Sequence, residues 1–414
     1  MTAALPDRPR RAVAASDLPR EVLGLLDDHL AAHADALVAL REDLHSHPEV
    51  SRDEHRTTQV VVDHLRAAGL RPHPLMSTGA ICDIGDDGPV VALRADLDAL
   101  PLHDTKDVPY RSVVDGVCHA CGHDVHTAAL VGAAQVLAQL HARGELPGRV
   151  RLLFQPAEET MPGGALDVVA AGGLGDAQEI YALHCDPRLA VGLLGVREGP
   201  LTAAGDRLEV VLAGPGGHTS RPHATADVVS ALGAVISQTP LLLSRRVDPR
   251  AGLALVWGVV EAGEAHNVVP SSGVVAGTIR CLDREVWDEA PDLVCSLVEE
   301  IAKPYGVDVD VRYTRGVPPV VTTSAAAEVL AAAAEAALGA GSATTTEQSL
   351  GGEDFAWYLE RVPGGMARIG VRDPADAGPA GDLHRPDFDA DPRSVAAAVR
   401  VLVATAVLAL QRLR

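Results

Sequence analysis

The chain has 414 residues, which is enough for two ordinary domains. Hydrophobic residues make up 47% and charged residues 22%, a composition that is normal for a soluble globular protein. The formal net charge of -21 argues against a nucleic acid or an anionic membrane as partner, because both require basic patches.

The two ends of the chain carry no recognisable targeting or membrane segment. Residues 1–30 contain arginines but no continuous apolar stretch after them, so we expect a flexible lead-in and not a secretory signal. The apolar run near the C-terminus is interrupted by Arg400 and Thr405 and is shorter than the ~20 residues of a membrane span, so we expect a buried terminal helix. We therefore place the protein in the cytoplasm, where its six cysteines should stay reduced.

Helices and strands alternate in the first half of the chain. Amphipathic helices are predicted after residue 20 and before Gly69, and three short apolar runs follow as strands: PVVALRAD (89–96), RVRLLFQP (149–156) and EIYALHCD (179–186). Helical segments lie between these runs, which indicates an α/β fold with a mostly parallel sheet and helices on both faces. Each run ends in polar residues, at the edge where such sheets bind ligands.

The pattern changes after about Leu201. DRLEVVLAGPG alternates like a strand with one solvated face, and a helix, two strands, a helix and a last strand follow it. This is the ferredoxin-like order. We therefore expect an inserted α+β domain at 202–315, within a first domain that is formed by 31–201 and 316–414.

The stretch HACGHDVH (119–126) concentrates residue types that bind metals. Cys118 and Cys121 form a Cys-x-x-Cys pair, which elsewhere indicates redox chemistry or structural zinc. A zinc ribbon needs a second such pair, and the other four cysteines are isolated. Cys121 and His123 remain as a candidate ligand pair, because alternate side chains of an extended segment point the same way. A polar loop with chance histidines is the alternative at this point.

The ends of other predicted elements supply matching groups. QPAEE places Glu158 and Glu159 just beyond a strand, where one carboxylate can bind metal while the other faces a reacting water. LHCD places His184 at the end of the next strand, and DLHRPDF places His384 in a loop. Each residue alone is more simply a surface or structural side chain, but together the four groups favour a metal-dependent site.

Motifs along nearly the whole chain beyond its first thirty residues resemble those of the di-metal amidohydrolases of the aminoacylase and carboxypeptidase superfamily. The similar branch is that of hippurate hydrolases and of hydrolases of indole-acetyl amino acids, which use a cysteine ligand. The resemblance implies a catalytic domain like that of di-zinc exopeptidases and an inserted lid and dimerisation domain. It rests on LREDLHSHPEVS, RADLDALPL, HACGHDVHTA, LLFQPAEE, GPGGHTSRPHATADVV, NVVPSSGVVAGTIR, GGEDFAWY and DLHRPDF.

Carried over residue by residue, the resemblance implies five metal ligands and a set of catalytic residues. Glu158 falls at the position of the general acid/base, and Cys121 at that of the ligand that bridges the two ions together with a water. Asp96 is counted with the catalytic residues, and with Asp124 it is a carboxylate that orients a ligand. Arg94 stands where sister branches have a histidine ligand. The implied ligands are Cys121, His123, Glu159, His184 and His384.

Three residues of the inserted domain match positions that act on substrate in the family. His218 is implied to reach an active site, commonly that of the partner subunit, and to polarise the scissile carbonyl oxygen. Asn267 and Arg280 are implied to contact substrate, and the guanidinium of Arg280 suits a free amino-acid carboxylate.

The resemblance implies metal-dependent hydrolysis of the amide bond of N-acyl amino acids or similar small conjugates, which releases a carboxylic acid and an amino acid. It implies two divalent ions per subunit, manganese or zinc before nickel or cobalt, and a homodimer or higher homo-oligomer. The alternatives are a dipeptidase or carboxypeptidase with the same chemistry, an inactive metal-bearing protein that only binds amino-acid conjugates, and a redox role for Cys118 and Cys121.

Overall fold

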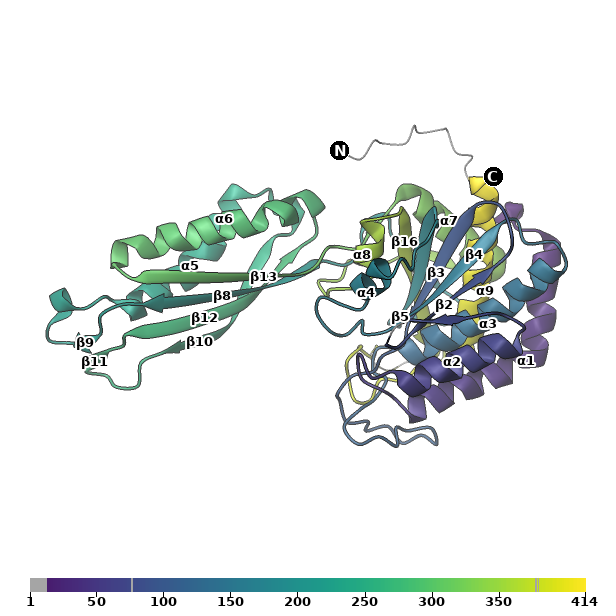
Figure 1. Cartoon of the computed structure of the whole chain (residues 1–414), viewed down its shortest axis with the longest axis horizontal. Helices are drawn as coiled ribbons and strands as arrows, with labels where there is room; N and C mark the ends of the chain where they lie inside the picture. The colour runs from purple at the N-terminus through teal and green to yellow at the C-terminus, as the bar shows by residue number, and fades with distance from the viewer. Residues whose placement is uncertain (1–12, 76, 377, 379) are drawn as a thin grey trace. The chain divides into compact units, whose positions relative to one another are not determined.

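The computed structural model describes residues 13–75, 77–376, 378 and 380–414 (Figure 1). The described chain divides into two compact units. The first comprises the chain up to Gly199, Val321–Glu347 and Trp357–Arg414, and the second comprises Pro200–Val320 and Gln348–Ala356. Residues 348–356 thus join the second unit, whereas the sequence assigned all of 316–414 to the first domain.

The first unit is built on an eight-stranded sheet whose middle is parallel. Strand β3 pairs in parallel with β4 and β5, and β5 pairs in parallel with β16. Every residue of β3 is buried, as expected for a strand that is covered on both faces. The order is β1 (His73–Pro74), β2 (Ala80–Ile84), β4 (Arg149–Gln155), β3 (Val90–Asp96), β5 (Glu179–Ala190), β16 (Gly364–Arg372), β6 (Leu194–Val196) and β15 (Ala343–Thr345).

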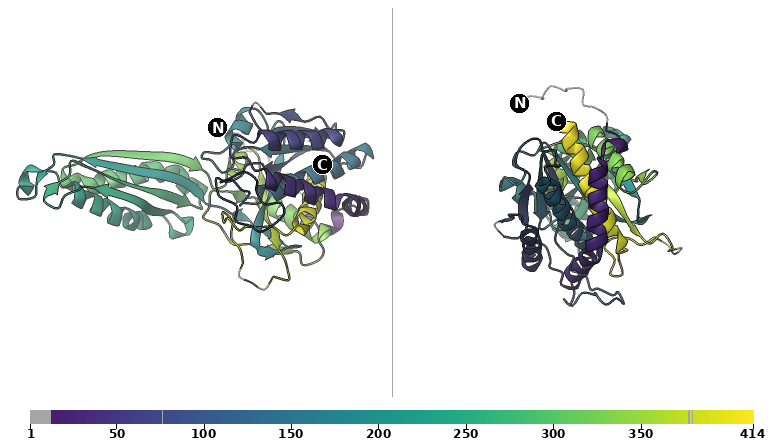
Figure 2. Two further views of the ribbon diagram at one scale, coloured as in Figure 1. Left: turned by 90° about the horizontal axis from the view of Figure 1, so that it is seen from below. Right: turned by 90° about the vertical axis from the view of Figure 1, so that its right-hand side faces the viewer.

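Helices cover this sheet and share one hydrophobic core with it. The helices α1, α3 and α7 all pack against α9 (Figure 2). The apolar stretch of α9 is long enough to cross a membrane, but 83% of it is buried inside the protein, so it forms the core helix that the sequence predicted. The bounds are α1 (Arg20–Ser46), α2 (His55–Ala67), α3 (His123–Ala142), α4 (Ala165–Ala170), α7 (Ser324–Ala337), α8 (Ala356–Leu359) and α9 (Arg393–Leu413).

The predicted lead-in at 1–30 needs a correction. Residues 1–12 lie outside the described residues, but α1 already begins at Arg20. Val22, Leu25, Leu26 and Leu30 are buried, with the three- and four-residue spacing of a helix face that packs on a core. Residues 20–30 are therefore part of the folded unit.

The second unit has the strand and helix order that the sequence predicted. Its antiparallel sheet runs in the order β10-β12-β8-β13, and α5 and α6 share a hydrophobic core with it. A separate two-stranded ribbon pairs β9 (Gly217–His218) with β11 (Val268–Val269). The main elements are β8 (Ala204–Ala213), α5 (Val228–Arg246), β10 (Ala254–Ala262), β12 (Ser272–Cys281), α6 (Arg284–Ala302) and β13 (Asp308–Val317). The predicted fold class is confirmed for both units.

Candidate metal centre

Three strands of the first unit lead into the predicted site. Strand β3 ends at Asp96 and β4 at Gln155, and these two residues are paired. The adjacent glutamates 158–159 follow β4 in the turn beyond it. His184 was expected at the end of its strand, but it lies within β5, two residues beyond Ala182, the last residue that pairs with β3. Because β5 no longer pairs with β3 at this position, His184 lies next to the carboxyl edge of the sheet.

The turn before α3 is tight and depends on a glycine. Gly122 has a φ of 92°, and a Cβ at this position would lie 2.6 Å from the Sγ of Cys185. Only glycine adopts such a backbone without strain and with this close approach. The turn places Cys121 two residues before His123, which is the first residue of the helix.

The five predicted ligands form overlapping groups in the first unit. The ligand atoms of Cys121, His123 and His184 lie within 4.8 Å of one another, and so do those of Cys121, Glu159 and His384. The Sγ of Cys121 is 3.5 Å from Nε2 of His184, and Nε2 of His384 is 3.1 Å from Oε1 of Glu159. Cys121 is thus common to two groups of three, as a ligand that bridges two ions must be.

Glu158 lies beside the same cluster. His123, Glu158 and Glu159 form a further group within 4.8 Å, and Oε2 of Glu158 is 3.9 Å from Nε2 of His123. The Glu158 side chain is 9% exposed, so its carboxylate is largely shielded from solvent while it faces the ligands.

Two of the histidines are oriented in the same way. Nδ1 of His123 donates to the carbonyl oxygen of Asp98 at 2.8 Å, and Nδ1 of His184 donates to that of Cys185 at 2.9 Å. Because a carbonyl only accepts, both rings donate through Nδ1, and Nε2 is the nitrogen of each ring that can face a metal ion. This arrangement is typical of histidines that bind metals.

The surroundings of His123 favour a positive charge. Burial opposes a charged ring, but Asp96 and Asp98 outweigh it and raise the pKa of His123 to about 10. Nε2 of His123 and Oε1 of Glu159 are buried and have no hydrogen-bond partner among the described residues, although the Glu159 oxygen is ion-paired with His384. Nitrogen and oxygen atoms that lack hydrogen-bond partners, next to a thiol and two carboxylates, fit divalent metal ions.

Asp96 and His126 lie next to the ligands and are hydrogen-bonded to each other. Nδ1 of His126 donates to Oδ1 of Asp96 at 2.6 Å, and its Nε2 accepts from the backbone N–H of Cys185 at 2.8 Å. Both ring nitrogens are therefore occupied, which excludes His126 as a ligand in this arrangement. Asp96 also accepts from Arg94 at 2.5 Å, and its Oδ2 lies 3.7 Å from Nε2 of His123. Burial opposes ionisation, but Arg94 and His123 hold the pKa of Asp96 well below its usual range.

Backbone strain is concentrated at this site. Among the described residues, three that are not glycine have a positive φ: Arg52 (73°), Ala157 (57°) and His384 (59°). Ala157 immediately precedes Glu158, and His384 is a predicted ligand whose N–H donates to the carbonyl oxygen of Ala120 at 2.7 Å. Such conformations persist only where the surrounding structure enforces them, and they are typical of functional sites.

Asp98 supports the site but is not among the residues that the sequence predicted. Its Oδ2 accepts from the backbone N–H of Glu159 at 2.9 Å and from the hydroxyl of Ser51 at 2.6 Å, and its carbonyl orients His123. The signal was present, because Asp98 follows Asp96 by two residues just beyond the end of a strand.

The three predicted substrate residues of the second unit fall into two places. His218 pairs with Val268 in the β9–β11 ribbon, and the carbonyl oxygen of the adjacent Asn267 accepts from the N–H of Thr219 at 3.1 Å. Arg280 lies near the end of β12 that is farther from the ribbon. It is eight positions beyond the first residue of the strand, which corresponds to about 26 Å at ~3.3 Å per residue. His218 and Arg280 of one chain are therefore not brought together within this unit.

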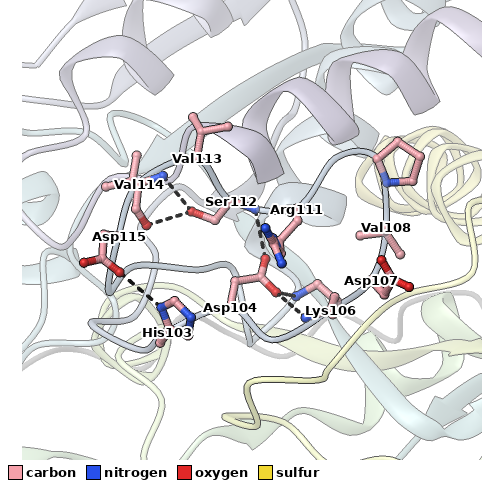
Figure 3. Close-up of a pocket in the computed structure, with 11 residues that line it drawn as sticks. His103, Asp104, Lys106, Asp107, Val108, Arg111, Ser112, Val113, Val114 and Asp115 are labelled. Atoms are coloured by element: carbon pink, nitrogen blue, oxygen red, sulfur yellow. Dashed lines mark hydrogen bonds and ion pairs between the residues drawn. The ribbon is translucent and has the colours of Figure 1, made fainter.

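A hollow of about 550 Å³ lies in the loop after β3 (Figure 3). It is lined by residues between His103 and Asp115 and contains none of the predicted ligands. Asp104 accepts from the backbone N–H groups of Lys106 and Ser112, both at 3.0 Å, and pairs with the Lys106 ammonium at 3.0 Å (Figure 3). These contacts shape the loop and do not add to the metal site.

Known proteins resemble this chain in sequence and in structure. A family model described as Peptidase family M20/M25/M40 matches residues 92–407. The Bacillus subtilis YXEP protein, described as a dinuclear metal binding peptidase from the M20 family, has a similar structure with a TM-score of 0.81. It is 34% identical to this chain, and the match covers 92% of this chain and 99% of that one.

Two relatives differ in how much of their own length matches this chain. N-acetylcysteine deacetylase of Bacillus subtilis (strain 168) is 37% identical over 382 residues, which are 91% of this chain and 98% of the relative. A Rhodococcus jostii (strain RHA1) protein named for glutamate–cysteine ligase 2-3 is 48% identical over 370 residues. That match covers 89% of this chain but only 46% of the relative, so the chain spans about half the length of that protein.

Proposed function

Because the chain belongs to peptidase family M20/M25/M40, as its motifs predicted, we propose that it hydrolyses the amide bond of small N-acyl amino acids. The products are a carboxylic acid and a free amino acid. One observation carries the proposal: Cys121 belongs to two groups of ligands, and Glu158 lies at their edge. The name of the Bacillus subtilis deacetylase, which refers to an N-acyl amino acid, supports this substrate class.

The proposed ligands would hold two divalent cations, with manganese or zinc expected before nickel or cobalt. When bound, such a pair makes a shared water acidic and stabilises the negative charge of the tetrahedral intermediate. Cys121 would serve both cations, because its sulfur lies within 4.8 Å of ligand atoms from both sets. The full ligand set is Cys121, His123, Glu159, His184 and His384.

Glu158 moves the proton in this proposal. Its carboxylate faces the ligand cluster and is only 9% exposed, so it accepts a proton from the attacking water without competition from solvent. It then delivers that proton to the amide nitrogen as the C–N bond breaks. Asp96 keeps the ring of His126 in place, and Asp98 keeps the ring of His123 and the backbone of Glu159 in place during these steps.

The second unit contributes substrate contacts and a dimer interface in this proposal. Strand β10 lies at the edge of its sheet, and Val256 and Val260 on it are 61% and 60% exposed. An unpaired edge with exposed valines favours association with another copy of the chain.

Because His218 and Asn267 lie apart from Arg280, we assign them to different active sites of a homodimer. The cytoplasmic location of the protein remains a prediction from the sequence. So does the acyl group of the substrate, which is a benzoyl or another acyl group.

The proposal is tested by a hydrolysis panel with manganese- and zinc-loaded protein. The substrates are N-acetyl amino acids, N-benzoyl amino acids and dipeptides, and Glu158→Gln is the blank. Faster release of amino acid from the N-acyl substrates supports the proposal. Faster cleavage of dipeptides favours a dipeptidase or carboxypeptidase, and binding without any hydrolysis favours an inactive binding protein.

A further inference from the structure

We propose that Glu54 is a positioning residue for the turn that carries Glu158 and Glu159. This inference rests on the proposed function, because it assigns Glu54 a role in the geometry of the same site. Glu54 itself touches neither substrate nor the proposed metal ions, and it acts through the backbone of Ala157.

The carboxylate of Glu54 is fully buried, with an exposed fraction of 0%. Its Oε1 accepts from the backbone N–H of Ala157 at 2.7 Å and from that of Arg52 at 2.9 Å, and its Oε2 accepts from the hydroxyl of Thr78 at 2.7 Å. One side chain thus connects the start of α2 with the turn that follows β4. Carboxylates that accept from backbone N–H groups make strong, charge-assisted hydrogen bonds.

The two backbone donors share an unusual property. Arg52 and Ala157 are two of the three residues other than glycine with a positive φ among the described residues. Such a conformation is strained for a residue with a side chain. The same oxygen of Glu54 stabilises both, and without it the buried N–H of Ala157 loses the partner that it has in this structure.

The turn is fixed on both sides of Glu158. On one side, Ala157 donates to Glu54, and its carbonyl oxygen accepts from the N–H of Gly164 at 2.8 Å. On the other side, the N–H of Glu159 donates to Asp98 at 2.9 Å. The backbone direction at Ala157 therefore decides where the carboxylates of Glu158 and Glu159 point.

Three variants separate positioning from general stability. Glu54→Ala removes both backbone bonds, whereas Glu54→Gln keeps an oxygen at Oε1 that accepts from both N–H groups. Glu335→Ala is the matched control, because Glu335 also accepts two backbone N–H groups, those of Gly341 at 2.8 Å and Ala343 at 3.0 Å. Its loop carries no predicted site residue.

The kinetic experiment measures kcat and KM on the best substrate of the panel. A misplaced catalytic group costs up to roughly 100-fold, so we expect Glu54→Ala to lower kcat about 10- to 100-fold. KM should change by less than about threefold, because substrate contacts are kept. Glu54→Gln should restore kcat to within about fivefold of the wild type, and Glu335→Ala should leave kcat unchanged.

Hydrogen exchange and metal retention provide readouts that do not depend on activity. In Glu54→Ala, the peptide that contains residues 153–160 should exchange faster, and the protein should lose metal more readily to a competing chelator.

If Glu54→Ala does not fold, Glu54→Asp, which is one methylene shorter, is measured in its place. Unchanged exchange and metal retention in the variant, or equal losses of kcat in Glu54→Ala and Glu335→Ala, would overturn the proposal. If the wild type hydrolyses nothing, the proposed function fails, while exchange and metal retention still decide the role of Glu54.

Discussion

The Sγ of Cys121 lies 3.5 Å from Nε2 of His184, although 63 residues separate them in the sequence. Nε2 is the unprotonated nitrogen of that ring, because Nδ1 donates to a backbone carbonyl. Burial is the main reason that the pKa of His184 lies well below its usual range, so the ring is neutral at pH 7. A neutral imidazole nitrogen that faces a cysteine sulfur in a buried site is an arrangement that a divalent cation such as zinc completes.

The two cysteines of the Cys-x-x-Cys pair should behave differently. Cys121→Ser replaces the proposed bridging sulfur with a hydroxyl, a poor ligand, and should reduce both metal content and hydrolysis at least about 10-fold. Burial raises the pKa of Cys118 to about 11, which keeps this thiol protonated at neutral pH and disfavours a role as a nucleophile. Cys118→Ala should therefore keep metal content and kcat near those of the wild type. Loss of activity in Cys118→Ala with metal retained would instead favour the redox alternative.

Replacing the proposed general base should separate chemistry from metal binding. Glu158→Gln keeps the size of the side chain but cannot accept the proton of the water, so kcat should fall by roughly 100- to 10,000-fold. Metal content, measured by elemental analysis, should stay at the wild-type value because Glu158 is not among the proposed ligands. A variant that retains most of its activity would exclude Glu158 from this role.

Mixed dimers should show whether His218 acts on the partner subunit's site. Glu158→Gln and His218→Ala homodimers should each be nearly inactive, because each removes one catalytic group from every site. If His218 acts across the dimer, a mixed dimer contains one intact site, and unfolding and refolding the two variants together should restore activity. Equal inactivity of the mixture and of the separate variants would show that both groups act within one subunit.

The second unit should depend on Asp206 for its stability. This buried carboxylate accepts from Nε1 of Trp287 at 2.7 Å, from the hydroxyl of Tyr313 at 2.6 Å and from the N–H of Gly316 at 2.8 Å. Asp206→Ala leaves these donors without their acceptor, at about 1–3 kcal/mol for each buried one, so the free energy of unfolding should fall by several kcal/mol. Denaturant titration measures this loss. The control is Asp310→Ala, whose partner Arg312 is exposed, and it should cost less than about 1 kcal/mol.

Much of the fold could be predicted because hydrophobic periodicity reports burial directly. The run 89–96 contains β3, whose residues are all buried, and the order of elements after residue 201 appears as the second unit. Ligand types at strand ends and in one loop also led to the cluster around Cys121. These features depend on local sequence, which is what residue patterns record.

Other features depend on contacts between distant segments and leave no local pattern. The positive φ of Ala157 is enforced by Glu54, which lies 103 residues earlier in the chain. His184 lies within a strand and not at its end, because β5 continues to pair with β16 after β3 has ended. The separation of His218 from Arg280 likewise follows from the length of β12. The sequence pattern predicted this strand but did not indicate that its length keeps the two residues apart.

The number of metal ions bound per chain tests the central claim most directly. Purified protein that has been loaded with manganese or zinc and then dialysed should contain two ions per subunit by elemental analysis. Cys121→Ser should contain fewer, because its side chain is shared by both groups of ligands. A wild-type protein that retains no metal ion, or a double variant Cys121→Ser and His123→Ala that still holds two, would contradict the account.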